Sequence, residues 1–204
     1  MSPAKRAPKP VSKPQRRHLT RVEVVAAAIA IVDESGADAL TTTAVARRLH
    51  VTQPAIYTHV ASLDELRAEV ARHGIEELSH ELREATEGLS GDDALFALAI
   101  AYRKYVARHP ARYLLQLSTG GSEQLLRVSE RAAEPARQVL RSYGLDEAHV
   151  RFAHAAMRAA IHGFVHLEAR GAMGSGNPVD EAFAYFIELL RNGLHYADGP
   201  PPTA

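Results

Sequence analysis

Apolar residues recur every three or four positions along almost the whole chain, the spacing that aligns them on one side of an α-helix. In residues 20–35, for example, Val25, Ile29 and Val32 fall at positions i, i+4 and i+7. Capping residues, glycines and prolines divide the pattern into about nine predicted helices, at 20–35, 42–49, 53–59, 62–87, 90–109, 111–118, 123–143, 146–169 and 178–195. No segment alternates as a β-strand does. The sequence therefore predicts an all-α protein.

The first three predicted helices form a compact unit, residues 19–62. Its two short helices and the three-residue turn between them have the dimensions of a helix-turn-helix motif. The second of these helices directs a set of mostly polar side chains outward: Gln53, Ala55, Tyr57, Thr58 and His59. Amide, hydroxyl and methyl groups read base edges in the major groove of DNA, and a tyrosine hydroxyl can hold a phosphate. The pattern favours DNA binding over the alternative, a helical hairpin with one polar face.

Charge is distributed unevenly along the chain. The 204 residues carry no formal net charge, because 24 Lys and Arg balance 24 Asp and Glu. Residues 1–60 nevertheless have a net charge of +5 and the remainder −5, which indicates that one part meets a polyanion. Residues 1–18 combine prolines with six Lys or Arg and no acid, which predicts a disordered basic tail. This tail is either a solvated end or an arm that contacts DNA through Arg16 and Arg17.

The composition excludes several classes of protein. Without cysteine the chain has no disulfide scaffold, thiolate zinc site or cysteine nucleophile. The apolar run at 24–32, behind the basic tail, imitates a signal peptide, but Glu23, Asp33 and Glu34 flank it and its pattern is amphipathic. No stretch approaches the ~20 apolar residues of a membrane span. We therefore expect a cytoplasmic protein, with export as the alternative.

Residues 40–66, LTTTAVARRLHVTQPAIYTHVASLDEL, carry a family resemblance. The threonine pair, Ala-x-x-Leu-x-Val, Ile-Tyr-x-His-Val and Ser-x-x-Glu-Leu resemble the DNA-binding domain of the TetR family of transcriptional regulators. The resemblance implies DNA contacts by Thr42, Gln53, Tyr57 and His59, with Thr43 and Pro54 beside them.

Two positions depart from the family pattern. His50 stands where the family has a glycine before the turn valine, so a non-glycine residue must adopt a left-handed conformation there, at some cost. Leu63 stands where the family has a phosphate-binding lysine. We hypothesise that the basic tail replaces this missing cation.

The C-terminal part carries a second resemblance. Residues 102–115, 160–173 and 181–183 are similar to the WHG-type ligand-binding domain of one branch of the family. The chain has no tryptophan, so only the His162-Gly163 part of that motif remains. The resemblance implies that residues 63–198 form a ligand-binding and dimerisation domain.

The last two predicted helices are apolar or small-sided on more than one face, which indicates burial on two faces. Two such helices meeting their symmetry mates would make a four-helix dimer interface. The alternative is that the internal core uses both faces. The predicted interface residues are Ala153, Ala156, Ala160, Gly163, Phe183, Phe186, Ile187, Leu190 and Leu194.

A ligand pocket is expected in the same domain, although each candidate wall residue is also a candidate for simple core. The candidates are Phe96, Ile100, Tyr102, Tyr105, Tyr113, Leu114, Met157, Ile161 and Phe164. Their chemistry favours a small, mainly apolar effector. We predict a repressor that binds an inverted-repeat operator as a homodimer, because two recognition helices must enter major grooves about 34–36 Å apart. No cofactor is expected.

Histidines offer a rival interpretation. His162 and His166 have the i, i+4 spacing of metal ligands on a helix, which would suit a helical enzyme or a metal-binding protein. No H-E-x-x-H sequence, phosphate-binding glycine loop or nucleophile elbow accompanies them. We therefore predict neither a catalytic nor a metal site. The base-reading face likewise disfavours a nucleoid-type protein that binds DNA without sequence preference.

Overall fold

A computed structural model describes residues 19–119, 123–174, 176 and 178–196. These residues contain α-helices and one 3₁₀ turn and no strand, as expected. In chain order the elements are α1 (Arg21–Ser35), η1 (Ala37–Ala39), α2 (Thr42–Leu49), α3 (Gln53–Tyr57), α4 (Leu63–Thr86), α5 (Gly91–Arg108), α6 (Pro110–Thr119), α7 (Glu123–Ala132), α8 (Glu134–Arg141), α9 (Glu147–Ala169) and α10 (Val179–His195). The all-α prediction is confirmed.

Two helix boundaries differ from the prediction. The helix expected over 123–143 is divided into α7 and α8, because Pro135 lacks an N–H and its ring clashes with the carbonyl of the preceding turn. The recognition helix α3 ends at Tyr57, two residues before the predicted end at His59. The hydroxyl of Thr58, the next residue, donates to the Ala55 carbonyl.

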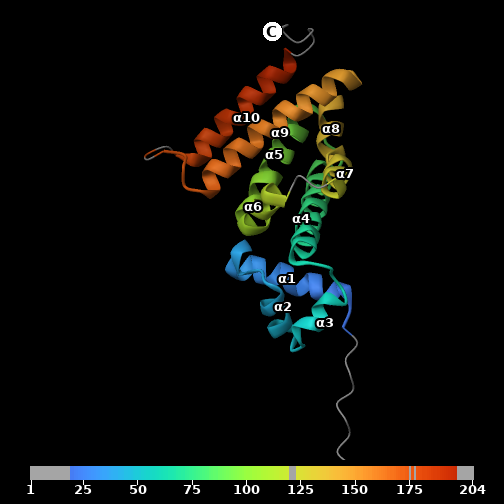
Figure 1. The fold of residues 1–204 in the computed structure, drawn as a ribbon. Coiled ribbons are helices and arrows are strands. Elements are labelled where there is room, and N and C mark those ends of the chain that lie inside the picture. Colours follow the sequence, from blue (N-terminus) through green and yellow to red (C-terminus); the bar gives the residue numbers. More distant parts are fainter. Residues whose placement is uncertain (1–18, 120–122, 175, 177, 197–204) are drawn as a thin grey trace, which may run out of the picture.

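The helices form two parts that lie one above the other (Figure 1), and each part has its own hydrophobic core. The lower core joins α1, α2 and α3 through buried Val32, Val45 and Ile56, and the upper core joins α4, α5, α6, α8, α9 and α10. Helix α4 belongs to both, since Leu66 packs below and Leu82 above. The longest helix is therefore a continuous link between the three-helix unit and the rest of the chain.

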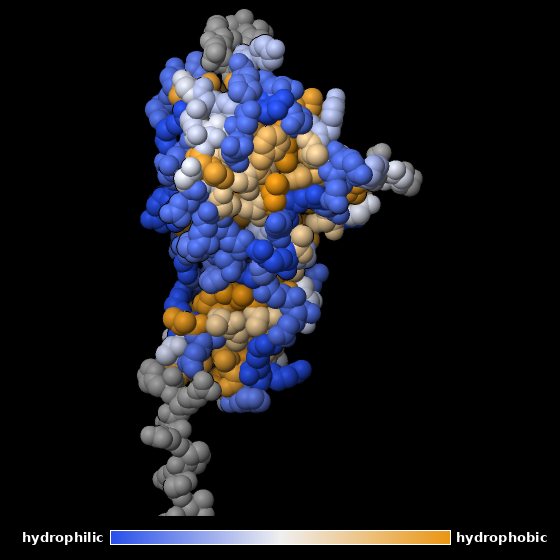
Figure 2. Space-filling view, turned by 180° about the vertical axis from the view of Figure 1, so that it is seen from behind, coloured by the Kyte–Doolittle hydropathy of each residue, from blue (hydrophilic) through white to orange (hydrophobic). Residues whose placement is uncertain are grey.

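Hydrophilic side chains cover the level where the two parts meet. Figure 2 shows apolar side chains gathered over the lower unit and again over the upper one, with a polar band between them. Such a surface agrees with a junction held by ion pairs as well as by apolar packing.

The junction centres on one buried cation. Arg112 of α6 is only 3% exposed. Its Nε donates to Asp33 Oδ1 of α1 at 2.7 Å and its Nη1 to Glu77 Oε2 of α4 at 2.5 Å. Its Nη2 lies 2.5 Å from the Nδ1 atom of His109. One guanidinium thus joins three helices, two in the upper part and one in the three-helix unit.

A second set of contacts joins α1 to α4 at the other end of the unit. Arg21 donates to the His59 carbonyl at 2.7 Å, just after α3, and pairs with Glu65 at 2.7 Å and Glu69 at 3.0 Å on α4. The position of α3 relative to α4 is therefore fixed by side-chain contacts in addition to the chain connection.

In the part of the chain that the structure describes, no helix is long and apolar enough to cross a membrane.

The burial of Arg112 makes a prediction about stability. Arg112→Met should lower the free energy of unfolding by about 2–4 kcal/mol, because it leaves two carboxylates facing each other without their cation. Arg108→Met is the matched control, since Arg108 is half exposed and pairs with Glu81 at the surface, and it should cost less than ~1 kcal/mol. Urea unfolding at one fixed protein concentration measures both. Equal costs would contradict a structural role for Arg112.

Candidate nucleic-acid interface and ligand pocket

The turn between α2 and α3 contains the left-handed residue that the sequence predicted. His50 adopts φ 55° and ψ 41°, and it is the non-glycine residue with positive φ among those described. This left-handed conformation costs a non-glycine residue about 1–2 kcal/mol. The Val51 N–H bonds the Ala46 carbonyl at 3.0 Å, which closes the end of α2 and sets the direction of α3. The expectation of a left-handed residue at this position is confirmed.

Most of the predicted DNA-reading side chains are exposed. Thr43 of α2 and Gln53, Pro54, Tyr57 and Thr58 of α3 or its end are exposed. Ala55 and His59 are half-buried beside them. Arg16 and Arg17 lie outside the described residues.

Thr42 is the exception and requires a correction. It is only 6% exposed, so it lies behind this surface. Its hydroxyl accepts from Gln53 Nε2 at 2.7 Å and lies 3.4 Å from the Tyr57 hydroxyl. Thr42 therefore orients the two side chains that face outward.

Some of the arginines near this surface are paired with carboxylates and one is not. Both terminal nitrogens of Arg48 bond Glu34 at 2.7 Å, and Arg21 is held by α4. Arg47 is exposed on α2, and its side chain makes no hydrogen bond or ion pair among the described residues. Leu63 packs against the lower core, where the family has a lysine. Arg47 was not among the predicted contacts, and its place one turn before the α2–α3 turn is the signal that could have identified it.

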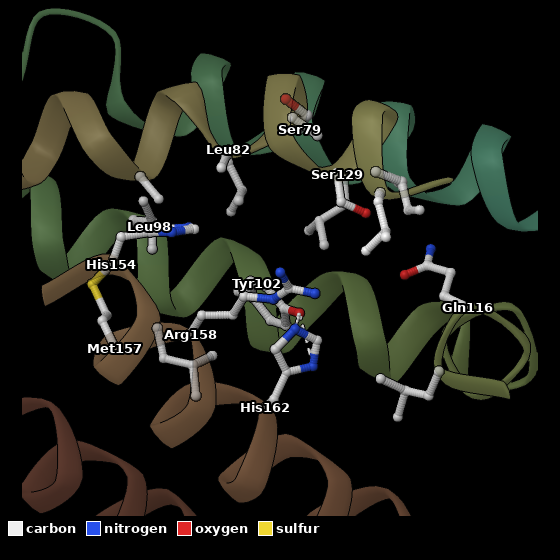
Figure 3. Close-up of a pocket in the computed structure, with 18 residues that line it drawn as sticks. Ser79, Leu82, Leu98, Tyr102, Gln116, Ser129, His154, Met157, Arg158 and His162 are labelled. Atoms are coloured by element: carbon white, nitrogen blue, oxygen red, sulfur yellow. Dashed lines mark hydrogen bonds between the residues drawn. The ribbon is translucent and has the colours of Figure 1, made fainter. Parts of the chain in front are cut away.

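A cavity of about 140 Å³ lies among α4 to α9 in the upper part (Figure 3). Its volume resembles that of a protein cavity that holds benzene. Leucine, isoleucine, alanine and methionine side chains form most of the wall. Of the predicted wall residues, Tyr102, Met157 and Ile161 line it.

The other six predicted wall residues do not line this cavity. Ile100 is exposed on the outer side of α5, and the Tyr105 hydroxyl donates to the Gly74 carbonyl at 2.9 Å within the core. Phe164 stacks on Phe186 of α10, on the opposite side of α9. Tyr113 is fully buried and its hydroxyl contacts His162. Phe96 and Leu114 are partly buried and pack against the upper core. Their spacing along the helices predicted that they would be buried, but it could not show which neighbouring helix each one faces.

Several polar side chains are distributed around the cavity wall. The wall includes Gln116 of α6, Ser129 of α7, and His154, Arg158 and His162 of α9. None of them except His162 had been considered from the sequence, because the cavity exists only where six helices converge.

His162 is held in its neutral form. The Tyr102 hydroxyl lies 2.8 Å from its Nε2 and the Tyr113 hydroxyl 2.6 Å from its Nδ1. Burial, then the charge of Arg158 and the nearby His166, lower the pKa of His162 to about 4. Burial raises the pKa of Tyr113 to about 12. Since tyrosine hydroxyls face both nitrogens, the arrangement does not suit a metal ligand pair of His162 and His166.

The outer faces of α9 and α10 are more apolar than solvent-exposed helices usually are. Phe152, Tyr185 and Leu189 are 61%, 68% and 55% exposed, respectively. A Cβ added to Gly163 would meet no atom within 4 Å, so this side of α9 is open to the approach of another helix. Together these positions form a second candidate surface, which we call the α9–α10 face.

The predicted interface residues fall on two sides of these helices. Ala156 and Gly163 are exposed, and Ala153 and Ala160 are half-buried. Phe183 and Ile187 are buried in the chain's own core, and Phe186, Leu190 and Leu194 pack against it, so the prediction assigned the inner stripe of α10 to the interface. The outer stripe lies two residues further on, at Tyr185 and Leu189. The periodicity could not separate the two stripes because both are apolar.

Comparison with known proteins gives matches over most of the chain. Residues 24–70 match the model of bacterial regulatory proteins of the tetR family, and residues 95–190 match that of the tetracyclin repressor-like C-terminal domain.

Relatives and solved structures agree with these matches. The uncharacterised HTH-type transcriptional regulator Rv0681 of Mycobacterium tuberculosis is 37% identical over 194 residues, 94% of this chain and 88% of that protein. The uncharacterised HTH-type regulator YobS of Bacillus subtilis is 27% identical over 86% of this chain and 93% of its own. The structure of BioQ with its natural double-stranded DNA operator has a TM-score of 0.68 and 27% identity, covering 88% of this chain and 99% of that one.

The neutral state of His162 makes a prediction about pH. Its pKa of about 4 lies below the ordinary 6.5, so the unfolded chain binds the proton first and stability is lost as the pH falls from about 6.5 towards 4. Between pH 7 and pH 5 this histidine should cost about 2 kcal/mol. His162→Gln should remove that part of the pH dependence of unfolding, whereas His80→Gln, at an exposed position of α4, should not. The same pH dependence in all three proteins would refute the assignment.

Proposed function

The chain belongs to the TetR family of DNA-binding transcriptional regulators, and we propose that it is a ligand-responsive repressor that binds an inverted-repeat operator as a homodimer. A small, mainly apolar molecule in the cavity would release it from the operator. Because the family consists of regulators, the rival interpretation of a helical enzyme is excluded.

The observation that carries this proposal is the surface of α3. Gln53 and Tyr57 are exposed side by side on the helix, and both are oriented by the buried Thr42 hydroxyl. A preoriented amide can make two hydrogen bonds to adenine in the major groove, and Arg47 adds an unpaired cation for a phosphate. A surface of this kind supports reading of sequence as well as attraction to DNA.

A homodimer is supported by the α9–α10 face. An isologous interface needs one apolar patch that meets its own copy, and a four-helix arrangement needs small residues where the helices cross. The face supplies both, since Phe152, Tyr185 and Leu189 are exposed on it and the space beside Gly163 is open. In Figure 1 α9 and α10 lie side by side on the upper part, away from α3. A twofold axis there would leave both recognition helices free.

Release by a ligand is supported by the helices that border the cavity. Helix α4 contributes Leu78 and Leu82 to the wall and Glu65 to the Arg21 contacts. Helix α6 contributes Gln116 to the wall and Arg112 to the junction. A ligand that prefers one placement of α4 and α6 therefore biases the placement of both three-helix units, by no more than its difference in affinity for the two states.

The first prediction from this proposal concerns DNA. Gln53→Ala should weaken binding to the operator by about 10- to 100-fold, equivalent to ~1–3 kcal/mol, while the salt dependence of binding stays unchanged. Gln124→Ala, at an exposed position of α7, is the control. Titration against the chain's own upstream intergenic DNA, with scrambled competitor at two salt concentrations, measures both. An unchanged affinity for Gln53→Ala would remove α3 as the reading element.

The second concerns assembly. Leu189→Glu places two like charges at an apolar twofold contact, so it should raise the dimer dissociation constant at least about 100-fold. Leu89→Glu substitutes another exposed leucine away from this face and should leave the dimer intact. Sedimentation equilibrium distinguishes the two. A Leu189→Glu protein that remains dimeric at the same concentrations would show that the interface lies elsewhere.

A further inference from the structure

The charge on the cavity wall is of one sign only. Among the described residues that line it there is no aspartate or glutamate, and Arg158 is the one side chain that is always charged. The two histidines of the wall, His154 and His162, have pKa values lowered by burial and by nearby arginines, so both are neutral at pH 7. The cavity therefore has one positive charge and no negative one to balance it.

Arg158 is directed into the cavity. In Figure 3 its guanidinium points from α9 into the cavity, beside Tyr102 and His162. Its side chain makes no hydrogen bond or ion pair with any residue that the structure describes, although most arginines of the upper part pair with a carboxylate. Its donors are free to bind a ligand.

Gln116 of α6 also lines the cavity, and its side-chain amide nitrogen packs against Gly74 of α4. The Nε2 atom of Gln116 is buried and has no hydrogen-bond partner. A buried donor without an acceptor costs about 1–3 kcal/mol. Gln116 comes from α6, four residues after Arg112, so a ligand that bonds it acts on the helix that joins the junction.

These observations assign the class of ligand. Resting on the proposed function, we propose that the effector is an amphipathic monoanion whose carboxylate pairs with Arg158 and whose apolar body lies among the leucines of α4 and α5. The planar guanidinium fork matches a carboxylate with two parallel hydrogen bonds. A cation would be repelled by Arg158, and a neutral ligand would gain no ion pair with this exposed guanidinium.

The size of the cavity limits the apolar body. A volume of about 140 Å³ accommodates one ring or a short aliphatic chain. Octanoate and benzoate are therefore suitable probes, and octanamide and benzamide are their uncharged counterparts of nearly the same shape.

Calorimetric titration of the full chain without DNA tests the proposal. The carboxylates should bind at least tenfold more tightly than the amides, a difference of ~1.4 kcal/mol. Arg158→Gln should remove this preference and leave amide binding unchanged. Arg151→Gln, also an exposed arginine of α9 but outside the cavity wall, should behave as the wild type.

Three results would overturn the proposal: no binding of either carboxylate at millimolar concentration, equal binding of acid and amide, or an unaltered preference in Arg158→Gln. A separate titration of the operator complex with the carboxylate tests the proposed function independently of the ligand class. Carboxylate binding through Arg158 without release of operator DNA would refute ligand-controlled repression and leave the ligand class intact. Failure to bind operator DNA at all would refute the repressor while the calorimetric result stands.

Discussion

Arg112 is the interaction on which the arrangement of the two parts depends. A guanidinium cannot lose its charge in a protein, so a buried one must be surrounded by acceptors. Here the acceptors come from different parts of the chain: Asp33 from α1 in the three-helix unit and Glu77 from α4 in the upper part. Moving the three-helix unit away from α6 would separate Arg112 from Asp33. The unit is therefore confined to orientations that keep this pair together or replace it with water.

The same short helix brings together the cavity and the DNA-binding unit. Helix α6 places Tyr113 on His162, Leu115 in the lower core and Gln116 at the cavity wall, all within one turn of Arg112. A ten-residue helix with these attachments cannot shift at one end without shifting at the other, because packed cores move in discrete steps. The proposed response to a ligand thus needs no long pathway: one rigid element has contacts at both sites.

The sequence predicted what is local and did not predict what depends on how helices meet. Helix positions, the left-handed turn at His50 and the exposed face of α3 follow from periodicity, capping and the family resemblance, and all three agree with the structure. The division at Pro135 could have been expected from the proline alone. The cavity polar groups Arg158 and Gln116 could not, since a single helical stripe does not show which other five helices converge on it. Similarly, α10 has apolar residues on both sides, and only packing shows that Phe183 faces inward and Tyr185 outward.

The central claim is that α6 couples the cavity to the DNA-binding unit through Arg112 and Asp33. Amide hydrogen exchange of α6, measured with and without operator DNA in the wild type and in Asp33→Asn, tests this claim without any effector. In the wild type, operator binding should slow exchange along α6 and in the adjoining wall of α4, because fixing α1 fixes Arg112. In Asp33→Asn the same DNA should protect α2 and α3 and leave exchange in α6 unchanged. Equal protection of α6 in both proteins would show that the coupling runs through other contacts.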